Sequence, residues 1–138
     1  MRIAAVAIAA SALAAGCGGG GPRANVRRPP APVTMTAAIH DDVVQVSPAR
    51  VGAGPIVLVV SNQTAKPQRV TFETDELGGS RAGRIASTPV IPAQGTGRLT
   101  IDARSGRYAV HVRSRAIRAA HVRVGAPRKS SQNDLLLP

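Results

Sequence analysis

The sequence contains one cysteine, Cys17, and three histidines, His40, His111 and His121, which are residue types that bind metals or act as nucleophiles. Two histidines and a carboxylate, such as Asp41 beside His40, can hold copper(II) or zinc. The competing interpretation is that the histidines are ordinary surface residues among arginines, whose positive charge disfavours a cation. We expect no bound metal or other cofactor, and we keep a site built from His40, His111 and His121 as the less favoured alternative.

The sequence carries no catalytic signature. It contains no Gly-x-Ser-x-Gly elbow, no His-Glu-x-x-His and no glycine-rich phosphate loop. Its acidic cluster, Glu73, Asp75 and Glu76, lies in a basic chain, and ion pairs with nearby arginines explain it better than catalysis does. The sequence therefore predicts that the protein is not an enzyme.

The N-terminus is typical of an exported precursor. Arg2 is followed by an uncharged apolar run that is too short for a membrane-spanning helix and fits a signal peptide. The run ends in Leu13-Ala14-Ala15-Gly16-Cys17, which resembles the lipobox of bacterial lipoproteins, although Leu13 lies one place further from the cysteine than usual. The resemblance implies cleavage after Gly16, lipidation of Cys17 and a location outside the cytoplasm, anchored to the cell membrane.

An ordinary secretory signal cut after an Ala-x-Ala-like site is the alternative. Cys17 is the only cysteine of the chain, and lipidation explains an unpaired cysteine in an exported protein. Two or three acyl chains would hold the protein stably on the membrane. This assignment leaves no thiol for a disulfide or for copper.

Composition divides the chain into four parts. The signal peptide (residues 1–16) is followed by the lipidated cysteine and a tether rich in glycine and proline (residues 17–32). Apolar residues then recur over residues 33–125, a length that can fold as one domain. Residues 126–138 end in Leu-Leu-Leu-Pro, and we expect a loose tail whose deletion leaves the melting temperature nearly unchanged; docking on a partner is the alternative.

The domain has the pattern of an all-β protein. Apolar and polar residues alternate with period two in short segments separated by Gly, Pro, Asn and Ser, as in a sandwich or barrel. Residues 56–61 form an apolar run that predicts a strand buried on both faces, and residues 77–86 are expected to form a loop. The predicted strands are residues 33–39, 43–46, 56–61, 69–73, 98–101, 107–113 and 120–124.

Charge and aromatic content narrow the choice of partners. Eighteen basic residues against seven acidic ones give a net charge of +11, with one Phe and one Tyr. Proteins that read single-stranded nucleic acid place aromatic residues among basic ones, so we exclude nucleic acid. The basic surface consists either of solvated arginines or of residues that attract phospholipid headgroups or anionic envelope polymers. A protein partner remains unknown.

Three segments resemble the cupredoxins, the family of plastocyanin and azurin: residues 46–54, 59–73 and 106–112. The resemblance implies a Greek-key β-sandwich over residues 33–125, with Tyr108 closing a Greek-key corner. The family's copper ligands would fall on Gln68, Val112 and Arg115, and its axial ligand near Ala119 or Ala120. These side chains cannot form the plane of two imidazoles and a thiolate that a blue-copper centre needs. The sequence therefore predicts a cupredoxin-like domain without type 1 copper.

Two functions from different classes follow. The favoured one is a non-catalytic binding or scaffolding module of the cell envelope, held on the membrane by Cys17. The alternative is a copper-handling lipoprotein that uses its surface histidines. An immunoglobulin-like adhesion domain has the same sandwich, and the sequence does not separate it from the first hypothesis.

Overall fold

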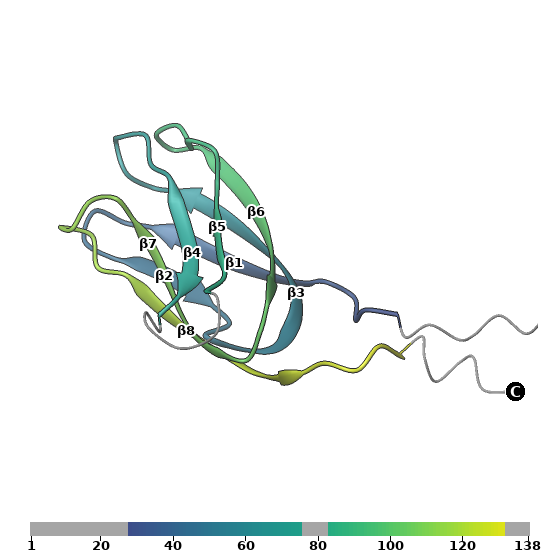
Figure 1. Ribbon diagram of the computed structural model, residues 1–138. Helices are drawn as coiled ribbons and strands as arrows, with labels where there is room; N and C mark the ends of the chain where they lie inside the picture. Colours follow the sequence, from purple (N-terminus) through teal and green to yellow (C-terminus); the bar gives the residue numbers. More distant parts are fainter. Residues whose placement is uncertain (1–27, 76–82, 132–138) are drawn as a thin grey trace, which may run out of the picture.

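The computed structural model describes residues 28–75 and 83–131, so the predicted signal peptide, the lipobox and the Leu-Leu-Leu-Pro end lie outside the described residues. Within these two ranges the chain is almost entirely β-structure (Figure 1). The strands are β1 (Val33–Ile39), β2 (Val44–Ser47), β3 (Arg50–Asn62), β4 (Val70–Thr74), β5 (Ile85–Ser87), β6 (Thr96–Ala103), β7 (Gly106–Val112) and β8 (Ala120–Pro127). The predicted all-β, Greek-key sandwich is confirmed.

The strands form two layers that share β3. In the first layer β3 lies between β1, which is parallel to it, and the antiparallel β6, and β2 pairs with the outer edge of β1. The second layer has the order β3-β8-β7-β4-β5, and only the first residues of β3 take part in it. The strand changes layer near Gly54, whose φ of +128° is a conformation that favours glycine. One long strand therefore joins the two sheets at a corner.

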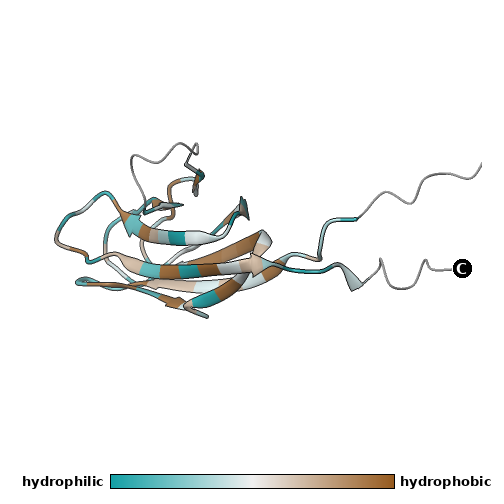
Figure 2. Ribbon diagram, turned by 60° about the horizontal axis from the view of Figure 1, so that its bottom comes forward, coloured by the Kyte–Doolittle hydropathy of each residue, from teal (hydrophilic) through white to brown (hydrophobic). Residues whose placement is uncertain are grey.

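The period-two pattern places the apolar residues between the layers. Figure 2 shows apolar and polar segments alternating along the strands. Phe72 on β4 and Tyr108 on β7 are both buried, and their rings stack with centroids 5.1 Å apart. Aliphatic side chains fill the rest of the core, including those of Met35, Ile39, Ile56, Leu58, Val60, Ile91, Val110 and Val122.

The observed strands correct three details of the sequence prediction. Val57 is 9% exposed but Val59 is 38% exposed, so β3 is not buried on both faces along its whole length. Ile85 and Ala86, expected in a loop, pair with β4 as part of β5. That strand has three residues and is at the sheet edge, so it is too short to show a period-two pattern. Residues 77–82 of the expected loop lie outside the described residues.

The third correction concerns the predicted tail. Ala126 and Pro127 belong to β8, and the backbone N–H of Arg128 donates a hydrogen bond to the carbonyl of Ala53. The first residues after 125 are thus bound to the sandwich rather than loose, because they continue the strand and bond to the backbone of β3. The N-terminal segment lies at the same end of the sandwich (Figure 1). No helix of the described residues is long and apolar enough to span a membrane.

Candidate functional site

The histidine, carboxylate and arginine side chains that could take part in binding lie mainly on the outer face of the second layer, which consists of β7 and its neighbours. The start of β7 is fixed by Tyr108, whose hydroxyl accepts a hydrogen bond from the Arg104 N–H at 2.9 Å and donates one to the Arg104 carbonyl at 3.0 Å. This is the corner geometry that the sequence resemblance implied. It holds the turn between β6 and β7, and inward-pointing Tyr108 leaves Arg107 on the outer face.

Two histidines lie on this outer face, on adjacent strands. His111 of β7 lies opposite Thr71 of β4, and His121 of β8 lies opposite Ala109 of β7. The two histidines are therefore on neighbouring strands of one sheet, and their alternation with buried residues puts both on its outer face. Their nearest charged neighbours are carboxylates and not each other.

Each of the two imidazoles contacts a carboxylate of β4 or of the residue after it. His111 Nε2 lies 2.9 Å from Glu73 Oε1, and His121 Nδ1 lies 3.2 Å from Asp75 Oδ2. The sequence predicted arginine partners for these acids, and this was wrong for Glu73 and Asp75. His111 is diagonal to Glu73 on the adjacent strand. His121 of β8 lies opposite Ala109 of β7, the strand between β8 and β4, and contacts Asp75 from across that strand. Glu76 lies outside the described residues.

A row of three arginines crosses the same face, and we call it the arginine row: Arg107, Arg123 and Arg50. Arg107 of β7 is directly opposite Arg123 of β8, which is in turn opposite Arg50 of β3. All three are exposed. Asp75 extends the row beyond Arg107, because its N–H donates to the Arg107 carbonyl.

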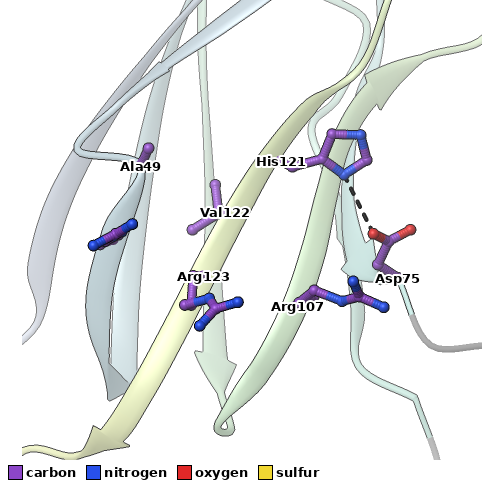
Figure 3. A pocket seen from close by; sticks show the side chains of 7 residues that line it. Ala49, Asp75, Arg107, His121, Val122 and Arg123 are labelled. Atoms are coloured by element: carbon purple, nitrogen blue, oxygen red, sulfur yellow. Dashed lines mark ion pairs between the residues drawn. The ribbon is translucent and has the colours of Figure 1, made fainter.

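The arginine row lines a surface hollow of about 470 Å³ together with Ala49, Asp75, His121 and Val122. Figure 3 shows Arg107 and Arg123 beside the ion pair of His121 with Asp75. Among residues 28–75 and 83–131, no carboxylate lies within ion-pair distance of any of the three guanidiniums. The hollow thus has an excess of positive charge and planar donors suited to an anion.

The positions that the resemblance assigns to copper ligands are occupied as follows. Val112 is buried in the core, where it lies opposite Val70, whereas Arg115 is exposed in the loop between β7 and β8. Gln68 is half-buried, and its backbone exchanges two hydrogen bonds with Ile91. The register brings Gln68 near Val112, because Val70 follows Gln68 by two residues.

Asn62, which is fully buried, holds together the loop after β3 and the segment before β6. Its Nδ2 donates to the carbonyls of Lys66 and Pro92 at 2.9 Å and of Ile91 at 3.3 Å. Its Oδ1 accepts from the N–H and hydroxyl of Thr64. All polar atoms of the amide are satisfied within the protein, so Asn62 has a structural role.

The third histidine, His40, is in the turn after β1, where its N–H donates to the Val43 carbonyl. Among the described residues, no group of three or more His, Cys, Asp or Glu side chains is arranged to hold a metal ion. His40, His111 and His121 are therefore not gathered into one ligand set. Cys17 lies outside the described residues.

Comparisons with known proteins place the fold. No protein-family model matches the chain, and no curated protein matches it in sequence. Among solved structures the sandwich is similar to auracyanin A, a "blue" copper protein from Chloroflexus aurantiacus. The TM-score is 0.53 at 14% identity, and the match covers 69% of this chain and 100% of that one. The chain therefore has a cupredoxin-like fold.

Two structures of amicyanin point mutants also match. The oxidised form of one gives a TM-score of 0.47 at 18% identity, and the reduced Cu(I) form of the other, at pH 4, gives 0.46 at 17%. Each match covers 66% of this chain and 81% of the amicyanin chain.

A blue-copper centre does not fit the residues at the three assigned positions. The resemblance assigns two imidazoles and a thiolate to these positions, and the chain has there the carboxamide of Gln68, the isopropyl group of Val112 and the guanidinium of Arg115. Val112 contributes to the core here. Fold likeness alone does not carry the chemistry of the neighbours to this chain.

Proposed function

We propose that this chain is an extracytoplasmic lipoprotein, anchored through Cys17, whose cupredoxin-like sandwich is a non-catalytic module that binds anionic material of the cell envelope. The observation that carries the proposal is the arginine row, three exposed guanidiniums in register on one face. The side chains at the assigned copper-ligand positions support a role other than electron transfer by type 1 copper. The lipobox-like segment supports the location.

Membrane fractionation tests the anchor. Wild-type protein is expected in the membrane fraction, and the Cys17→Ser variant, or cells treated with globomycin, should show unprocessed or released protein. The lipid anchor is ruled out if the distribution and the mass of the protein are the same in all three cases.

Metal analysis tests the alternative of copper handling. Protein purified from its native membrane should hold less than stoichiometric copper, and copper(II) added to it should bind weakly. Tight one-to-one binding that is lost in His111→Ala would favour the copper-handling lipoprotein instead. Glu73→Gln is the matched variant, because it removes the carboxylate charge beside His111 without removing the imidazole.

A further inference from the structure

Without a bound anion, the like charges of the arginine row repel one another and destabilise the fold. Residues directly opposite each other on neighbouring strands have Cβ atoms about 5 Å apart, and like charges at such positions are destabilising. Arg107, Arg123 and Arg50 form two such pairs in succession. Many polar side chains would suit these outward positions, and arginine at all three creates a repulsion that a bound anion would turn into attraction.

In the described part of the chain, no ion pair engages the three arginines of the row. The nearest carboxylate, Asp75, has its Oδ2 on His121. The ion pairs of the described residues engage Glu73, Asp42 and Asp75, and none engages the arginine row. An external anion is therefore the partner that these guanidiniums lack.

The chemistry of the row fits a phosphate group. A guanidinium presents planar N–H donors that match two oxygens of a phosphate, and three of them can contact several oxygens at once. A second hollow, of about 420 Å³, shares Arg107 and Arg123 and continues over Gly106 and Gly125. Because these glycines carry no side chain, a flat surface can approach the row from this side.

The row also lies beside the place where the N-terminal segment reaches the sandwich. Arg50 is two residues from Gly52, whose carbonyl accepts from Arg128 Nε, and Arg128 Nη1 donates to the carbonyl of Ala31. A chain from Cys17 to Ala31 spans at most about 50 Å when fully extended and about 20 Å as a flexible coil. An anchor at Cys17 would therefore keep the row within reach of the headgroups.

We propose that the arginine row binds the phosphate groups of anionic phospholipids in the membrane that carries the anchor. This inference rests on the proposed function and names the anion and the residues that hold it. It predicts that the outer face of β3, β8 and β7 lies against the bilayer when the domain is bound to the membrane.

Vesicle binding tests the row separately from the anchor. The mature chain, residues 17–138 with Cys17→Ser, is mixed with vesicles of phosphatidylcholine alone or with added phosphatidylglycerol, and bound protein is measured by co-sedimentation. In the same background, the triple variant Arg50→Gln, Arg107→Gln, Arg123→Gln is expected to lose affinity for the anionic vesicles by about fivefold per arginine removed. The N-terminal segment is the same in all variants, so the ratio of affinities reports the arginines.

The control is a triple variant of equal charge, Arg98→Gln, Arg113→Gln, Arg115→Gln, whose side chains are exposed elsewhere on the sandwich. It should lose clearly less affinity than the row variant. Equal losses in the two triple variants, or equal binding to neutral and anionic vesicles, would overturn the proposal. So would a row variant that loses affinity for a poly(glycerol phosphate) chain but keeps its affinity for vesicles.

Thermal melting tests whether a variant loses binding because it unfolds. Removing like charges from adjacent strands is expected to leave the melting temperature of the row variant unchanged or higher. If the triple variant unfolds, the single Arg123→Gln, at the centre of the row, must show the fivefold loss. Failure of the vesicle test with a normal Cys17 fractionation result would reject the row and keep the anchor.

Discussion

Arg128 Nη1 donates a 2.6 Å hydrogen bond to the carbonyl oxygen of Ala31, which lies 97 residues earlier in the sequence. The same guanidinium donates from Nη2 to the Pro55 carbonyl at 2.7 Å and from Nε to the Gly52 carbonyl at 3.2 Å. One side chain thus fastens the N-terminal segment and the residues after β8 to the corner of β3. The end of the sandwich at which the proposed tether arrives is thereby fixed.

Replacing Arg128 should destabilise the domain. Arg128→Met keeps an aliphatic stem over Gly52 and removes all the side-chain donors, so the three carbonyls must find water instead. We expect a loss of about 2 kcal/mol in the free energy of unfolding, or roughly 10 °C in melting temperature for a domain of this size. Lys129→Met, at the exposed next position, is the control and should melt like wild type. Identical melting of the two variants would show that the bonds of Arg128 do not contribute.

The hydroxyl of Tyr108 should contribute measurably to stability. Tyr108→Phe retains the ring that stacks on Phe72 but leaves the N–H and carbonyl of Arg104 without their partner. A loss of about 1–2 kcal/mol in urea-induced unfolding is expected. Arg104→Ala is the matched variant, because both hydrogen bonds of the Tyr108 hydroxyl are to the backbone of that residue. A loss in Arg104→Ala as large as that in Tyr108→Phe would contradict the assignment.

A charged side chain at position 62 should destabilise the domain. In Asn62→Asp, a carboxylate oxygen replaces the amide nitrogen that now donates to the carbonyls of Lys66, Ile91 and Pro92. A buried group that faces three acceptors with no donor should cost about 3 kcal/mol or more. Chemical denaturation measures the cost, and Gln63→Glu, at the exposed neighbour, should be close to neutral. A variant as stable as wild type would mean that this amide does not organise the loops.

Glycine should be required at 54 and not at 125. An added Cβ at Gly54 would meet Arg128 Nη2 and Pro30 Cγ at 3.0 Å, and the φ of +128° disfavours any side chain. Gly54→Ala is therefore expected to lower stability by about 1–3 kcal/mol. At Gly125 the nearest atom would be 3.8 Å away, so Gly125→Ala should have little effect. Calorimetric melting of both variants checks the difference. If Gly125→Ala lowers the melting temperature more than Gly54→Ala does, the corner of β3 does not require glycine.

Much of the fold was predictable because it depends on local pattern. Alternating apolar residues marked β1, β4, β6, β7 and β8, and the bounds of β1 were predicted to the residue. β5 was missed because three residues at a sheet edge leave too short a pattern. Alternation with apolar residues marks His111 and His121 as outward-facing, but their acidic partners could not be foreseen, since these depend on which strands lie beside β7.

The arginine row was the main element that sequence reasoning missed. Arg107 and Arg123 alternate with buried residues, and this pattern marks them as outward-facing but not as neighbours. Arg50 joins them only because the start of β3 leaves the first sheet and runs parallel to β8. No local signal in the sequence encodes that pairing.

The sequence by itself determined the all-β class, the period-two core, the excess of arginine and the identity of the side chains at the assigned copper-ligand positions, because composition and alternation are properties of the chain alone. Only the tertiary structure decided that Arg50, Arg107 and Arg123 share one row, that Glu73 and Asp75 meet histidines, and that Arg128 reaches Ala31. The physical reason is that strand order and register arise from the packing of the two layers, which brings together residues far apart in the sequence.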